Sequence, residues 1–302
     1  MLATLVEDYF SDSHWIFECK FDGWRCIVSS RAGKVTLWSR NHRDLSAVYP
    51  ELVRTLSGQG DYVADGELVA MQGGVSSFQR LQQRAGVRVA APDPTIAVEL
   101  YLFDLPWCAG YDLTQVPLLA RKKVLKQAVR FNKLAHYTNH LASEGEKYRD
   151  LACKAGWEGV IAKRADSTYV SARSTDWLKF KCVRRQELVI VGYTEPQGAR
   201  SDFGALLLGY YDNKHLRYAG KVGTGFDQAL LGDLGRKLAR LERKSPAVTD
   251  PPRERGLHWV EPKLVGEIGF TEWTGEGRLR HPRFIALRTD KPAREIVRER
   301  AL

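Results

Sequence analysis

The sequence lacks every segment that would place it in or across a membrane. It has no run of about 20 apolar residues, the length that a transmembrane helix needs. Its start, Met1–Asp8, has neither the basic beginning nor the long apolar core of a secretory signal peptide. We therefore expect a protein that is not exported and has no membrane partner.

Cysteine is also scarce. The five cysteines are an odd number without CxxC spacing, so the pattern favours neither a disulfide framework nor a zinc site. A reducing, cytoplasmic setting fits this usage best. The five are Cys19, Cys26, Cys108, Cys153 and Cys182.

What the sequence does have is length, apolar content and positive charge. Its 302 residues, 44% of them hydrophobic, are enough for a large core and predict two domains. The formal net charge of +10 favours a polyanionic partner, although a basic surface can also serve solubility alone.

One lysine stands where chemistry is expected. Lys20 follows an apolar run that is typical of a strand, and the turn residues Asp22 and Gly23 come directly after it. A second apolar run, residues 24–28, then begins, and the alternation up to Ser39 predicts an antiparallel meander. A lysine nucleophile needs surroundings that lower its pKa and a group that orients it, which Asp22 can supply. The alternative is a solvated lysine in a hairpin turn.

The spelling Lys20-x-Asp22-Gly23-x-Arg25 resembles motif I of the covalent nucleotidyltransferases, which are ATP-dependent DNA ligases, RNA ligases and mRNA capping enzymes. Further matches follow in the family's order and approximate spacing, and several short motifs in register are far more specific than one. They are Ser39-Arg40-Asn41, Asp65-Gly66-Glu67, Tyr101-Leu102-Phe103-Asp104, Glu158-Gly159-Val160-Ile161-Ala162-Lys163 and Trp177-Leu178-Lys179-Phe180-Lys181.

The resemblance implies a nucleotide site around Lys20, which would carry a covalent AMP taken from ATP. Glu18 and Phe103 would bind the adenine, Arg25 and Glu67 the ribose, and Arg40 would lie near the nucleotide and nucleic-acid phosphates. From the residues alone, three of these features have a structural alternative. Residues 62–70 read as two short strands around a common Asp-Gly bend, Arg40 as a surface arginine, and Phe103 as a core aromatic.

The resemblance also implies the phosphate and metal ligands. Glu158 would hold Mg²⁺ or Mn²⁺, and Lys163, at the other end of the same apolar strand, is a further nucleotide-binding candidate. Lys179 and Lys181 share one face of a strand because side chains alternate, so both can reach one phosphate. In the family such lysines neutralise the α-phosphate and would depress the pKa of Lys20. An exposed basic strand face is the alternative.

The first part of the chain also predicts four helices. They are expected at residues 48–56, 77–84 and 117–130, and from Ser143, where Glu146 completes a capping box, to a C-terminal Gly156. The third has a basic outer face, and we assign it no chemistry.

Beyond residue 182 the pattern changes to short strands at residues 188–193, 205–211, 216–222 and 259–273, interrupted by a helix at 227–243. This order fits a five-stranded OB-type barrel with an inserted helix. We therefore predict an α+β protein whose adenylation domain, residues 1–184, consists of antiparallel sheets with helices and precedes an OB-fold domain at residues 185–302.

The C-terminal segment narrows the resemblance to bacterial ATP-dependent DNA ligases of the end-joining type. Arg288-x-Asp290-Lys291 resembles motif VI, whose residues orient the departing pyrophosphate in the family. The resemblance implies a monomer that seals nicked or broken duplex DNA beside the bacterial nucleoid, with a Ku-like end-binding protein as a partner. The alternatives are an RNA ligase, a GTP-using capping enzyme, and a basic nucleic-acid-binding module without chemistry.

Overall fold

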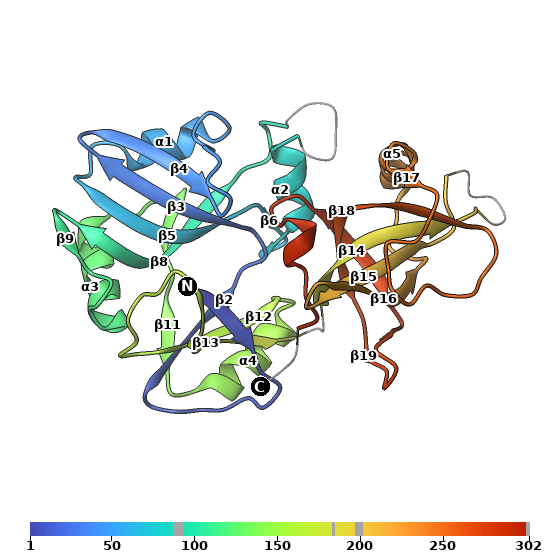
Figure 1. Cartoon of the computed structure of the whole chain (residues 1–302). Helices are drawn as coiled ribbons and strands as arrows, with labels where there is room; N and C mark the ends of the chain where they lie inside the picture. The colour runs from blue at the N-terminus through green and yellow to red at the C-terminus, as the bar shows by residue number, and fades with distance from the viewer. Residues whose placement is uncertain (87–92, 183–184, 197–201, 300–302) are drawn as a thin grey trace. The chain divides into compact units, whose positions relative to one another are not determined.

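The computed structural model describes residues 1–86, 93–182, 185–196 and 202–299 (Figure 1). The chain divides into two compact units, Met1–Cys182 and Val183–Glu299. The division predicted after residue 184 falls two residues from this one, and residues 183–184 lie outside the described part.

The first unit contains a five-stranded sheet that carries most of the predicted site. Its strands are, in spatial order, β1 (Leu2–Leu5), β13 (Arg173–Lys181), β12 (Gly159–Arg164), β2 (Trp15–Lys20) and β11 (His140–Ala142). One face is apolar, with Phe17, Val160 and Phe180 fully buried, and helix α4 (Gly145–Lys154) packs against it. Because strand side chains alternate, Glu18 and Lys20 point to the opposite face.

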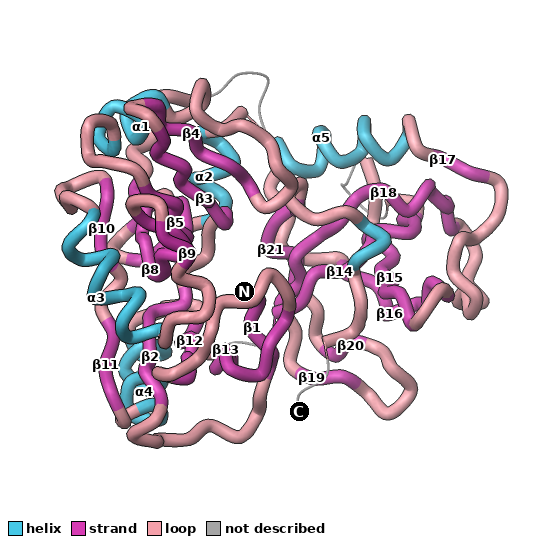
Figure 2. Tube along the Cα trace, turned by 60° about the vertical axis from the view of Figure 1, so that its left-hand side comes forward, coloured by secondary structure: helices cyan, strands magenta, loops and turns pink. Residues whose placement is uncertain are grey.

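A second sheet in the same unit has the order β10 (Ala135–Tyr137), β8 (Glu99–Cys108), β5 (Tyr62–Val69), β3 (Trp24–Arg31) and β4 (Lys34–Ser39), and β9 (Tyr111–Asp112) also pairs with β8. Helix α3 (Leu118–Ala128) packs on β8, and α1 (Pro50–Leu56) contacts β4 and β10. Helix α2 (Phe78–Arg84), which is cyan in Figure 2, follows the hairpin of β6 (Met71–Gln72) and β7 (Val75–Ser76).

Two strand predictions are wrong. Residues 15–39 do not form one meander, because β2 and β3 belong to different sheets. Gly23 lies at the crossing between the sheets, where a Cβ atom would stand 2.2 Å from the carbonyl oxygen of Leu68. Residues 62–69 are a single strand rather than two around a bend, and the register shift at Asp65 and Gly66 is an irregularity within it.

The predicted helices are present with different ends. Helix α4 begins at Gly145, and Ser143 has a positive φ of 69° instead of capping it. The capping box is therefore wrong. Ser11 takes the place of Ser143, because its hydroxyl accepts a hydrogen bond from the Glu146 amide and also contacts the Glu146 carboxylate. Gly156, with φ of 77°, follows the helix end as predicted.

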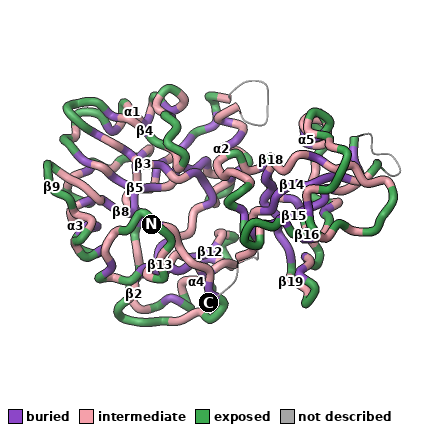
Figure 3. The backbone as a smooth tube through the Cα atoms, in the orientation of Figure 1, coloured by how far each residue is buried: buried purple, intermediate pink, exposed green. Residues whose placement is uncertain are grey.

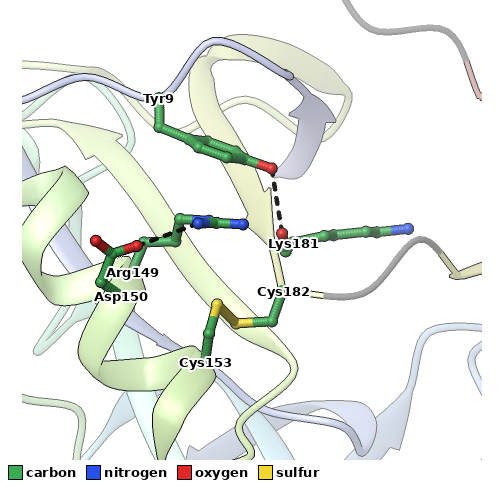
Figure 4. Close-up of a disulfide and its surroundings, with 6 residues drawn as sticks. All are labelled: Tyr9, Arg149, Asp150, Cys153, Lys181 and Cys182. Atoms are coloured by element: carbon green, nitrogen blue, oxygen red, sulfur yellow. Dashed lines mark hydrogen bonds and ion pairs between the residues drawn. A yellow bond between two sulfur atoms is a disulfide. The ribbon is translucent and has the colours of Figure 1, made fainter.

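Cys153 and Cys182 form a disulfide that links α4 to the residue directly after β13 (Figure 4). The sequence pattern, which favoured no disulfide framework, misses this bond because the two cysteines are 29 residues apart and meet only when α4 packs against the sheet. Cys19, Cys26 and Cys108 have free thiols.

The second unit is built on a sheet of β16 (His215–Val222), β15 (Leu206–Asp212), β14 (Arg185–Thr194), β18 (Leu257–Gly269) and β17 (Glu242–Arg243), with β21 (Arg283–Arg288) pairing with β18. Helix α5 (Gln228–Ala239), capped by the Asp227 side chain, ends four residues before its predicted end and buries three leucines in the core (Figure 3). A hairpin of β19 (Glu272–Trp273) and β20 (Leu279–Arg280) and a 3₁₀ turn (Ala293–Glu295) complete the unit. Among the described helices of both units, none is long and apolar enough to cross a membrane.

Candidate active site

Five of the predicted site residues of the first unit lie on the β13–β12–β2 sheet, namely Glu18, Lys20, Lys163, Lys179 and Lys181. Strand register places three rows of residues side by side across one face of this sheet. From the carboxyl end of β2 inward, the rows are Lys20, Gly159 and Lys181; Glu18, Ile161 and Lys179; and Ile16, Lys163 and Trp177.

Gly159 keeps the first row open between the two lysines. Its φ is 152°, and a Cβ atom would stand 2.1 Å from the carbonyl oxygen of Phe180. A glycine at this position leaves no side chain between Lys20 and Lys181. An anion bound over Gly159 would therefore have an ammonium group on each side.

Lys20 is the last residue of β2, and its ammonium nitrogen lies 2.5 Å from a carboxylate oxygen of Glu158. Burial alone would lower the pKa of Lys20, but the Glu158 charge and hydrogen bond, together with the charges of Asp22 and Glu67, outweigh burial and raise that pKa above its ordinary value. The pKa of Lys20 is thus raised, and not depressed as the resemblance implies.

Arg25 is held by a residue that the sequence pattern assigned to a turn. Its guanidinium makes a bidentate ion pair with the fully buried Asp65 carboxylate, which also accepts a hydrogen bond from the Tyr169 hydroxyl at 2.7 Å. The same guanidinium lies over the Phe103 ring, 4.9 Å from its centroid. Asp65 therefore fixes Arg25 against the aromatic ring expected to meet the base.

Glu18 lies in a buried cluster with two lysines. Its carboxylate oxygens accept from Lys122 Nζ at 2.6 Å and from Lys163 Nζ at 2.5 Å. Although burial works in the opposite direction, the two ammonium groups hold the pKa of Glu18 below its usual range. Burial, assisted by the Lys122 charge, lowers the pKa of Lys163 to about 8. The Lys163 ammonium also lies 4.2 Å from the centroid of the Phe103 ring.

A pocket of about 340 Å³ adjoins Lys20. Its volume is at the lower end of the range for small-molecule sites, and it combines aromatic walls with a few polar groups, as such sites do. Phe103 does not line it. Its aromatic lining residues are Phe21, Tyr101, Tyr137, Tyr148 and Trp157.

The carboxylate of Glu158 is the group that fits a divalent cation best. Among the described residues, no cluster of three or more His, Cys, Asp or Glu side chains could hold a metal by itself. Mg²⁺ does not need one, because it is usually held by one or two carboxylates together with substrate phosphates and water. Glu158, beside Lys20 and on the side where phosphates would bind, suits that mode.

Other predicted residues do not belong to the β13–β12–β2 sheet. Arg40 directly follows β4 in the second sheet of the first unit. Arg288, Asp290 and Lys291 belong to the second unit, where Arg288 pairs with Asp290 at 2.8 Å and with the buried Glu267 at 3.1 Å, and Lys291 pairs with Glu187.

Several residues of the site carried no recognisable sequence signal. Lys122 reads as part of a basic helix face, Tyr169 lies in a loop, and Ile161 is one apolar residue of a strand. Asp65 is the exception, because an acidic residue in the middle of an otherwise apolar strand could have indicated a buried ion pair.

Comparison with known proteins follows the same division of the chain. Residues 1–181 match the family described as ATP dependent DNA ligase domain, and residues 199–291 match the ATP dependent DNA ligase C terminal region. The multifunctional non-homologous end joining protein LigD of Pseudomonas aeruginosa is 42% identical over 311 residues, which cover 99% of this chain and 36% of that protein. The LigD protein of Mycobacterium tuberculosis is 39% identical over 300 residues, which cover 95% of this chain and 38% of that protein. The chain thus spans less than two fifths of either relative.

Solved structures of DNA ligases are similar to this chain as well. A mycobacterial DNA ligase D complexed with ATP and MES has 34% identity and a TM-score of 0.68, and the match covers 99% of this chain and 98% of that one. The ligase domain of M. tuberculosis LigD has 35% identity and a TM-score of 0.51 with the same coverage. The fold is therefore α+β, a nucleotidyltransferase domain followed by an OB-fold domain. With its first 181 residues in one ligase family and a fold shared with a ligase that binds ATP, this chain belongs to the ATP-dependent DNA ligases.

Proposed function

We propose that this chain seals breaks in duplex DNA through a covalent Lys20–AMP intermediate. The observation that carries the proposal is the row of Lys20, Gly159 and Lys181 on one sheet face, with the Glu158 carboxylate against the first lysine. An amine, a second ammonium and a metal-binding carboxylate are the groups that transfer of a nucleotidyl group requires.

In the first step the unprotonated Lys20 Nζ attacks the α-phosphorus of ATP. A phosphorus–nitrogen bond forms, the bond to the bridging oxygen of the β-phosphate breaks, and pyrophosphate leaves. Lys179 and Lys181 neutralise charge on the α-phosphate, while Asp22 helps to orient the amine. Because Lys179 and Lys181 are fixed on a strand, they stabilise the charge without having to reorganise.

The nucleoside would be held by the residues around Glu18 and Arg25. Glu18, Lys163 and Phe103 would receive the adenine, and Arg25 and Glu67 the ribose. Arg40 would lie near the phosphates. A divalent cation, Mg²⁺ or Mn²⁺, would be held by Glu158 and would supply further neutralisation of phosphate charge when bound.

Two further transfers would complete the reaction. A DNA 5′-phosphate takes the adenylyl group from Lys20, and a 3′-hydroxyl then displaces AMP to close the backbone. For Arg288, Asp290 and Lys291 we propose the orienting of pyrophosphate in the first step, which requires the guanidinium to exchange a carboxylate for a phosphate. The surplus of ten positive charges supports a DNA substrate.

We further propose that the sealing serves DNA end joining in bacteria. The names of the LigD relatives support this role, since both are non-homologous end joining proteins. A Ku-like end-binding partner, action as a monomer and a place beside the nucleoid in the cytoplasm belong to the same proposal.

The test is the intact mass of the purified protein after incubation with Mg²⁺ and ATP, GTP or NAD⁺, followed by peptide mapping. The expected product is an adenylyl group on Lys20 from ATP alone, and Lys20→Ala should abolish it while leaving DNA binding in place. A guanylyl adduct would instead identify a capping enzyme. Absence of any adduct, in protein shown not to be adenylated already, would leave only a nucleic-acid-binding module.

A further inference from the structure

Lys122 is a buried lysine that the proposed chemistry does not use. It lies on α3, and its side chain is 1% exposed, whereas the next residue on the same helix, Lys123, faces solvent. A buried ammonium is retained only where its donors are satisfied, because removing the charge from water is costly. The hydrogen-bond partners of Lys122 therefore indicate which groups this lysine positions.

Three acceptors surround the Lys122 nitrogen and match its three N–H donors. They are the Glu18 carboxylate at 2.6 Å, the Thr138 carbonyl at 3.0 Å and the Phe103 carbonyl at 3.4 Å. Glu18 is on β2 of the first sheet, and Phe103 is on β8 of the second. One ammonium group thus fixes the relative positions of two strands from different sheets within the first unit.

Two of the three partners lie near Lys20. Glu18 comes two residues before Lys20 on the same face of β2, and Thr138 lines the pocket beside Lys20. The Thr138 hydroxyl is buried and has no hydrogen-bond partner in the described part of the chain. A group bound in the pocket could supply that partner.

The Glu18 carboxylate still has accepting capacity. Two oxygens offer about four lone-pair positions, and each oxygen accepts one lysine bond. Held in its ionised form, the carboxylate can accept from an amino group on a base, but it would repel a carbonyl oxygen in the same place. Adenine presents an amino group at position 6 and guanine presents a carbonyl.

We propose that Lys122 is a positioning residue for base recognition, which holds the Glu18 carboxylate and the Phe103 and Thr138 main chains in the arrangement that selects a 6-amino purine. The proposal rests on the proposed function, because it assigns the base-binding end of the same site. Lys122 acts through Glu18 and need not touch the nucleotide.

The test compares self-adenylation by the wild-type chain, Lys122→Met and Lys122→Gln, with Lys123→Met as the matched control on the same helix. Each protein is given ATP or purine riboside triphosphate, which lacks the 6-amino group, and KM and the rate at saturation are measured separately. The wild type should prefer ATP by about tenfold or more, the value of one hydrogen bond to a charged group. In Lys122→Met the KM for ATP should rise about tenfold and the preference should largely disappear, while the rate at saturation changes little.

Lys122→Gln covers the case in which the methionine variant does not fold, since its amide can still donate to the carbonyl groups but carries no charge. A thermodynamic cycle with Glu18→Gln then tests the route. If Lys122 acts through Glu18, the two substitutions together should reduce the preference no further than either alone.

A purely structural lysine would give a different result. The variants would then melt at lower temperature and lose activity with both nucleotides in proportion, with the preference for ATP intact, and the positioning role would be refuted. That outcome would leave the proposed function standing. Failure of the wild-type chain to form any adduct would overturn the proposed function itself.

Discussion

Lys20 and Glu158 form a close ion pair, 2.5 Å between nitrogen and oxygen, which joins the proposed nucleophile to the proposed metal ligand. The Glu158 carboxylate can therefore bind either the Lys20 ammonium group or a divalent metal cation, but not both in the same way. While it is bound to Lys20, it favours the protonated and unreactive amine.

Glu158→Gln should separate these roles. Without the carboxylate, Lys20 loses the charge that raises its pKa, so the amine should react faster with acetic anhydride near pH 8 than it does in the wild type. Adenylation should nevertheless fall by about a hundredfold or more, the scale on which loss of one electrostatic group acts in catalysis. Peptide mapping gives the labelling rate and intact mass gives the adduct.

Glu144→Gln is the control for Glu158→Gln, because Glu144 is half exposed and pairs with the exposed Lys147. It should alter neither measurement. If Glu158→Gln adenylates at the wild-type rate, Glu158 is not the metal ligand.

The Cys153–Cys182 disulfide should contribute measurably to the stability of the first unit. It closes a loop of 29 residues between α4 and the end of β13, and the chain-entropy relation gives about 3–4 kcal/mol for a loop of this length. Reduction, or Cys153→Ala, should lower the free energy of unfolding in urea by a comparable amount. Cys108→Ala, which removes a free thiol, should respond to reductant as the wild type does. A midpoint that does not move on reduction of the bond would contradict the assignment.

The strand positions of the motif residues could be predicted from the sequence because each motif is contiguous. Period-2 alternation was enough to place Lys179 and Lys181 on one face, and strand register confirms it. Lys20 was expected on a sheet, and it is the last residue of β2. Each of these inferences depended only on residues within one strand.

The parts that could not be predicted depend on contacts between distant segments. A helix face with several lysines gives no indication that Lys122 alone turns inward, since only its three acceptors from β2, β8 and the loop before β11 make burial favourable. The dipeptide Asp65-Gly66 is typical of a hairpin turn. Tertiary contacts override this local preference, because Asp65 pairs with Arg25 from within the strand.

That same ion pair leads to a prediction about stability. Asp65→Asn leaves the Arg25 guanidinium without its charged partner in a largely buried position, and breaking a buried ion pair costs about 3–5 kcal/mol. Unfolding in urea should show a loss of this order. Tyr169→Phe, which removes only one hydrogen bond to Asp65, should cost about 1 kcal/mol. Equal losses in the two variants would mean that the ion pair itself adds little.

The last prediction concerns Lys163 and pH. Burial lowers the pKa of this lysine from 10.5 to about 8 in the folded chain, so between these two values the unfolded chain binds a proton that the folded chain does not. The free energy of unfolding of the wild type should therefore rise with pH in this window relative to Lys163→Met, by about 3 kcal/mol in all. Below pH 8 both states carry the proton, and the difference between the proteins should be constant. Urea titrations at pH 7, 8, 9 and 10 give the comparison.

Lys122→Met provides the sharper check, because loss of the second ammonium should raise the pKa of Lys163 and move the start of the window upward. If wild type and Lys163→Met change in parallel across the whole range, Lys163 keeps its ordinary pKa and the two ammonium groups are not competing for Glu18.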